Sequence, residues 1–134
     1  MSSQLRSEHG AVLVAGLLLT VAMMLVIGFA VDLGRAFIAR RDLSNVADQA
    51  ALTGSQAIDL PALHAGHLQL DATLARADAM RVIATERGLR GSATAGAQNV
   101  TVAVTRRVPT ILLALAGVRN ITVSAHATAS PQQP

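Results

Sequence analysis

The sequence predicts an α+β fold: a single membrane-spanning helix continues into a long helix, a second helix follows, and a β-hairpin interrupted by a short helix closes the chain. Three observations predict this fold. Residues 10–31 form an uncharged apolar run. Apolar residues keep a helical spacing through 32–58 and again through 71–87. Two segments after residue 97 instead alternate apolar and polar residues, as strands do.

Composition excludes several classes of function. The chain has 134 residues and no Cys, so disulfides, thiolate metal sites and a cysteine nucleophile are ruled out. It has no Trp or Tyr and only 2 Phe, which removes the usual stacking platforms for nucleic acid. The 11 cationic side chains are all Arg, are spread along the chain and leave a net charge of +3. We therefore expect no nucleic-acid partner.

The apolar run 10–31 is predicted to cross a membrane once, because it lacks charge and Pro and has about the 20 residues that span a hydrocarbon core. One alternative is a buried core helix, but so small a domain has too little apolar surface to surround one. The other is a cleaved signal peptide, since Gly28-Phe29-Ala30 resembles a small-x-small cleavage site. Against cleavage, the run is longer than the usual signal core of about 7–15 residues.

The helical pattern continues beyond the span. No Pro interrupts residues 32–58, and a continuous helix from Gly10 to Ile58 would be roughly 70 Å long. At 100° per residue, small side chains gather on one face of its second half. We interpret this face as a helix-packing surface, for a partner helix or for the protein's own second helix. Its members are Ala36, Ala47, Ala50, Ala51 and Gly54.

Residues 59–70 break the helix with Pro61 and Gly66. Asp71 is predicted to be the N-cap of a second helix that runs to about Arg87. The segment that follows is rich in glycine and is predicted to be a flexible connection. Its glycines are Gly88, Gly91 and Gly96.

The last third is predicted to be a hairpin of two strands, 98–107 and 120–129. Between them, Pro109 suits the first turn of a short helix and Gly117 its end. Two strands cannot cover so apolar a helix, so some of its side chains are predicted to contact a partner chain or the membrane surface. These are Ile111, Leu112, Leu113 and Leu115. The tail, residues 130–134, is predicted to be disordered.

No constellation of residues predicts catalysis. The sequence has no nucleophile elbow, no glycine-rich phosphate loop and no HExxH motif. His64 and His67 are interpreted as exposed loop residues. We expect no enzyme activity, cofactor, metal or small-molecule substrate. Asp32 is distinctive, because an acid directly after the span must reach the interface or form a pair, and Arg35 follows three residues later.

Three segments in order resemble the TadE/TadG-like proteins of the Flp, or tight-adherence, pilus system. They are SEHGAVLV at the start of the apolar run, VDLGRAFIARRDLSNVADQAALTGSQA directly after it, and VTVAVTRRVPTILLALAGVRNITVSAHATA near the end. The most specific part is the Asn-x-Ala-Asp-x-Ala-Ala-Leu helix at 45–52, and residues 59–97 match least. The chain has no room for the von Willebrand-type domain of longer TadG members, so it resembles the short form.

The resemblance implies a bacterial inner-membrane protein with a cytoplasmic flank at 1–9, a span at 10–31 and an extracytoplasmic pilin-like domain at 32–129. It implies a non-enzymatic minor pilus subunit or assembly factor, whose partners are other pilin-like or Tad pilus assembly proteins and the lipid bilayer. The arginines after the span would by themselves favour the opposite orientation. The alternative function is a membrane-anchored or released extracytoplasmic binding protein unrelated to a pilus.

The resemblance also makes Gly10-Ala11 a candidate processing site. Processed pilin-like members usually have Glu five residues after the cleaved Gly, where this chain has Ala15. An intact amino terminus and a processed one are therefore both kept as alternatives.

Overall fold

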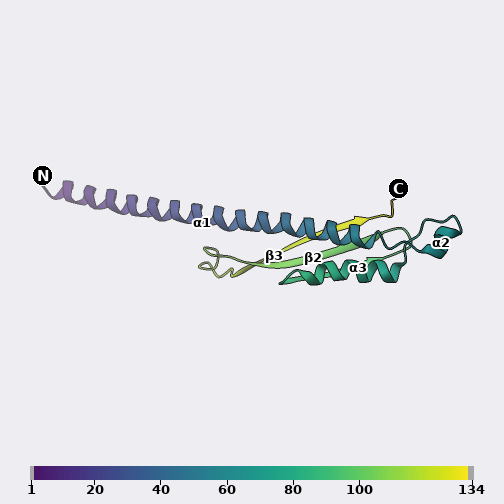
Figure 1. Ribbon diagram of the computed structural model, residues 1–134. Coiled ribbons are helices and arrows are strands. Elements are labelled where there is room, and N and C mark those ends of the chain that lie inside the picture. Colours follow the sequence, from purple (N-terminus) through teal and green to yellow (C-terminus); the bar gives the residue numbers. More distant parts are fainter. Residues whose placement is uncertain (1, 133–134) are drawn as a thin grey trace.

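A computed structural model describes residues 2–132 of the chain. Its first element, α1 (Ser2–Gly54), is one unbroken helix of 53 residues, which makes a rod of about 80 Å. The rest of the chain packs beside the second half of this rod, while the first half extends alone (Figure 1). No Pro precedes Pro61, so nothing in the sequence interrupts the helix. The predicted continuation of the span into a long helix is confirmed.

Two further helices follow α1. The first, α2 (Leu60–His64), is one short turn at the far end of the molecule (Figure 1). The second, α3 (Ala72–Thr85), begins where the Asp71 carboxylate accepts hydrogen bonds from the N–H groups of Thr73 and Leu74, both at 3.0 Å. The predicted N-cap at Asp71 is confirmed, and the helix ends two residues before Arg87.

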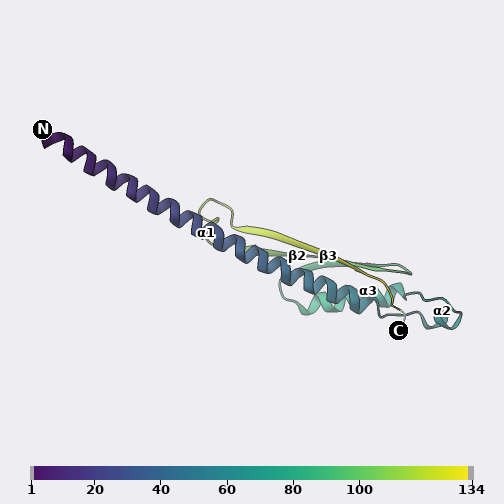
Figure 2. The ribbon, with the colours of Figure 1, turned by 90° about the horizontal axis from the view of Figure 1, so that it is seen from above.

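Three antiparallel strands form one sheet in the order β1-β2-β3. They are β1 (Leu89–Ala95), β2 (Val100–Pro109) and β3 (Asn120–Ala129). Val102 lies at the centre, paired with Ala93 on one side and Ala127 on the other. Alternate residues of β2 are buried, as the period of two predicted, because both α1 and α3 pack on the same face of the sheet (Figure 2).

We call residues 55–129, which pack on α1, the head. The core between the head and α1 is made of small side chains. Ala47 and Ala50 of α1 and Ala75 and Ala79 of α3 are completely buried. At Gly54, a Cβ atom would lie 2.8 Å from the carbonyl oxygen of Ala75, so only glycine allows this approach of the two helices. The small-residue face of α1 therefore packs on α3, which is the predicted second helix, and on the sheet.

The segment predicted to be a flexible connection after residue 88 is instead strand β1, so that prediction is wrong. Glycine and small polar residues have low strand propensity, and the strand is formed by pairing with β2. Gly91 fits because a Cβ there would lie 3.0 Å from the carbonyl oxygen of Ala103 and 3.1 Å from Ile83. Two glycines of the predicted connection lie outside the strand: Gly88, with a φ of 73°, is in the turn out of α3, and Gly96 is in the turn between β1 and β2.

The short helix predicted between the last two strands is also absent. Pro109 is the last residue of β2 rather than the first of a helix. Residues 110–119, which we call the β2–β3 loop, form consecutive turns instead, ending at Gly117 with a φ of 92°. The predicted disordered tail falls partly outside the described residues, and 130–132 have no regular secondary structure.

Candidate functional site

The most unusual site of the molecule lies where the β2–β3 loop meets α1, at the end of the head nearest the apolar half of the rod (Figure 1). Asp32 projects from α1 into this loop and is only 2% exposed. Its carboxylate accepts three backbone hydrogen bonds, from the N–H groups of Ile111 at 2.8 Å, Leu112 at 2.9 Å and Leu113 at 2.9 Å. One buried acid thus fastens the loop to the helix across about 80 residues of chain.

These hydrogen bonds set the charge state of Asp32. The N–H groups of Leu113 and Ile111 lower the pKa of the Asp32 carboxyl below its ordinary value, and they outweigh the opposing effect of burial. The N–H of Leu112 and the positive charge of Arg35 act in the same direction. The predicted relation of Asp32 to Arg35 is therefore electrostatic, and the main partners of the carboxylate are backbone groups.

Because its pKa is lowered by folding, Asp32 stabilises the loop fully above the ordinary aspartate pKa and loses this effect as the pH falls through the lower, folded value. We expect the loop amides to be insensitive to pH down to about pH 4 and to change only in more acidic solution. Amide chemical shifts of Ile111 and Leu113, followed by NMR during acid titration, check this. Asp32→Asn should abolish the transition, and an unchanged transition in that variant would contradict it.

The loop also touches α1 at Gly28. A Cβ at this position would overlap the Leu112 side chain, so the absence of a side chain creates the seat for leucine. Next to this contact lies an apolar groove of about 590 Å³. It is bounded by α1 residues from Val21 to Val31 and by Ile111, Leu112 and Leu115 of the loop.

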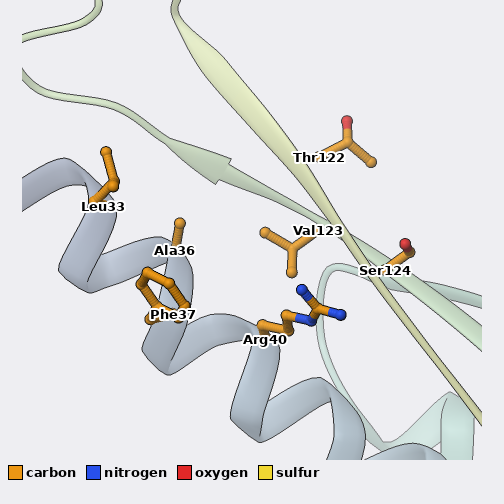
Figure 3. Close-up of a pocket in the computed structure, with 7 residues that line it drawn as sticks. All are labelled: Leu33, Ala36, Phe37, Arg40, Thr122, Val123 and Ser124. Atoms are coloured by element: carbon orange, nitrogen blue, oxygen red, sulfur yellow. The ribbon is translucent and has the colours of Figure 1, made fainter.

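A second groove, of about 340 Å³, lies between α1 and β3 (Figure 3). Leu33, Ala36 and Phe37 line it from the helix, and Arg40 extends from the helix toward β3. Phe37 is 68% exposed although it stands outside the apolar run. Large apolar side chains are therefore accessible on α1 just after residue 31, where the predicted span ends.

The residues singled out by sequence lie in three places. Ala47, Ala50, Ala51 and Gly54 are buried in the core against the head, so they are not available to another chain. Ala36 is half-buried at the edge of the second groove. The predicted contact residues share the β2–β3 loop: Ile111 and Leu115 are 56% and 80% exposed, and Leu112 and Leu113 are half-buried.

The candidate processing site, Gly10-Ala11, is exposed on α1, and the helix runs through it without a break. His64 and His67 are exposed near α2. Within residues 10–132, no group of three or more His, Asp or Glu side chains could hold a metal ion. Sequence reasoning marked Asp32 but did not find its partners, since the sequence carries no local signal for contacts with residues 111–113.

The apolar half of α1 is exposed over all of residues 10–27. In the part of the chain that the structure describes, α1 is the one helix long and apolar enough to cross a membrane. Only 6% of its most apolar 18-residue window is buried, so it is not a core helix of the head. An N-terminal helix of this kind is consistent with a single-pass membrane anchor.

Comparison with known proteins agrees with these features. No curated protein and no solved structure matches the chain. The model of the Flp pilus-assembly TadE/G-like family matches residues 10–77, which cover the apolar half of α1, the rest of that helix, α2 and the start of α3. The match includes residues 59–77, which belong to the segment of weakest resemblance, and does not extend to the strands. The match covers half of the chain, and the protein belongs to the TadE/G-like Flp pilus-assembly family.

Proposed function

We propose that this protein is a non-enzymatic, membrane-anchored subunit or assembly factor of a Flp-type pilus. The amino terminus lies in the cytoplasm and the head lies on the extracytoplasmic side. The observation that carries this proposal is the shape of the rod: α1 holds a head on its second half and leaves its first half bare. A bare apolar half can be held by lipid in the membrane and by neighbouring helices in an assembly.

The surface for partners differs from the one suggested by the small-residue face. Ala47 and Ala50 are used by the protein's own core, so we place the lateral contacts on exposed apolar side chains of α1 nearer the apolar run. Phe37 and Ile38 are 68% and 64% exposed, and they lie about 10 Å beyond the end of the apolar run. Large exposed apolar side chains are typical of sites that another protein or the membrane covers. We assign the partner contact to this part of α1.

Affinity purification from membranes of the native host tests the proposal. The full chain with a carboxyl-terminal tag should retain components of the Tad pilus system. Phe37→Asp should reduce that recovery several-fold, because a charge would have to be buried in the contact. The matched control is Leu63→Asp, which places the same charge on an exposed leucine of α2 at the opposite end of the head. Recovery of only unrelated envelope proteins would favour the alternative, an extracytoplasmic binding protein.

Amino-terminal sequencing of the mature protein decides the processing alternatives. A start at Ala11 identifies prepilin-type processing after Gly10, an intact start identifies a retained anchor, and a start near Val31 identifies release from the membrane. The last result would contradict the proposed role, because a released head would lack the bare half of the rod.

A further inference from the structure

We propose that the β2–β3 loop is a second membrane contact, which inserts Ile111, Leu112 and Leu115 into the lipid leaflet on the side of the head, beside the span. This contact requires α1 to cross a bilayer but requires no pilus. It can therefore fail while the proposed function holds, and the reverse is also true.

The depth of the loop supports the proposal. The Leu112 side chain fills the seat at Gly28, which is three residues, or about 4.5 Å, inside the end of the apolar run. The adjoining groove reaches Val21, about 15 Å inside that end. If residues 10–31 occupy the hydrocarbon core, the apolar tip of the loop must lie below the membrane surface, because it is attached to α1 at that level.

Most backbone N–H groups of the loop have hydrogen-bond partners within the protein, as a position in the hydrocarbon of the membrane requires. Irregular backbone in hydrocarbon is costly unless its polar groups find partners within the protein. Asp32 accepts from the N–H groups of residues 111–113. The N–H groups of Thr110 and of residues 115–118 donate to carbonyl oxygens within the loop. Eight of the nine N–H groups from 110 to 118 therefore have partners, although the loop lies on the surface of the molecule.

The side chains agree with the backbone. Leu115 is 80% exposed and Ile111 is 56% exposed, an arrangement that is unfavourable in water and favourable among acyl chains. The groove beside them is apolar, with Met24 and Leu25 of α1 on its other wall. Its volume of about 590 Å³ is enough for a lipid acyl chain to pack between the loop and the helix.

Positive charge surrounds the loop on the side of the head. Arg107 precedes it by three residues, Arg119 is its last residue, and Arg35 stands one helical turn above Asp32. All three side chains are exposed. Arginines directly above an apolar insertion can bind the phosphates of anionic lipid headgroups while their stems remain near the acyl chains. We favour lipid over a protein partner as the group that covers the loop. At this depth lipid already surrounds α1, so a protein partner would have to displace it.

The absence of Trp and Cys allows a direct test with single reporters. Leu115→Trp would be studied in the full-length protein in vesicles of phosphatidylethanolamine and phosphatidylglycerol. Brominated lipids serve as quenchers within the bilayer and acrylamide as a quencher in water. Leu63→Trp on α2 is the matched control, because it replaces an exposed leucine far from the loop. We expect blue-shifted emission with strong bromolipid quenching at position 115, and several-fold stronger acrylamide quenching at position 63.

Water-exposed emission at position 115 without bromolipid quenching would overturn the proposal. A blue shift that disappears when the protein is diluted in lipid would also overturn it, because a second copy rather than lipid would then cover the loop. A nitroxide on Leu115→Cys gives an independent reading that does not require a bulky ring. Greater accessibility to oxygen than to a water-soluble nickel complex would support insertion, and the opposite order would contradict it.

Discussion

Replacing Gly54 by Val is expected to destabilise the head by about 1–3 kcal/mol, because the added side chain overpacks the closest contact between α1 and α3. A Cβ at this position would lie 2.8 Å from the carbonyl oxygen of Ala75 and 3.3 Å from the Cβ of Ala79. Neither atom belongs to a flexible side chain that could move aside. The helices would have to separate, which would also open the contact with Val100 of β2.

Gly34→Val is the matched control, because a Cβ at this position of the same helix meets no atom within 4 Å. The measurement is hydrogen exchange at the core amides of β2 in micelles or nanodiscs. We expect faster exchange for Gly54→Val, by about tenfold or more for a loss of 1.4 kcal/mol or more, and little change for Gly34→Val. Equal protection in the two variants would show that the observed approach of α1 to α3 does not limit stability.

Asp32→Ala is expected to release the β2–β3 loop from α1 while the rest of the head stays folded. The three N–H groups of residues 111–113 would lose their acceptor together, and no other acceptor for them is seen in the described structure. We expect their amide exchange to accelerate at least about tenfold, whereas amides in the centre of β2 keep their protection. Hydrogen exchange followed by mass spectrometry or NMR separates the two regions.

Asp48→Ala is the control for this change, because Asp48 is an exposed acid on the same helix. Gly28→Val reaches the same loop without altering the carboxylate, since the added side chain would displace Leu112 from its seat. Both Asp32→Ala and Gly28→Val should therefore loosen the loop, and Asp48→Ala should not. Undiminished protection of the loop amides in Asp32→Ala would contradict the role given to Asp32.

The elements with a local signal could be predicted from the sequence. The long helix after the apolar run, the Asp71 cap and the alternation in β2 and β3 each depend on residues close together in the chain, and the structure confirms them. Of the small residues that the helical spacing places on one face of α1, Ala47, Ala50, Ala51 and Gly54 are buried and Ala36 is half-buried. The choice between a partner helix and the protein's own second helix depends on tertiary packing, which one helix pattern does not contain.

The missed features depend on contacts between distant residues. Strand β1 has glycine and few β-branched residues, and it exists because β2 pairs with it. In the β2–β3 loop, Pro109 and Gly117 predict a helix, but β2 continues through Pro109 because it pairs with β3. The residues that follow form turns, and Asp32, about 80 residues earlier in the chain, holds them on α1. A useful signal was present nonetheless: an acid directly after a membrane span requires a partner.

Site-specific photo-crosslinking in living cells tests most directly whether this rod works by contacting other parts of a pilus machine. A benzophenone amino acid would replace Phe37 near the end of the apolar run, and in a second strain would replace Leu63 on α2. The proposed function predicts a crosslink from position 37 to a membrane or pilin-like component of the Tad system and none from position 63. Crosslinks from position 37 only to lipid, or only to proteins outside the pilus system, would contradict it.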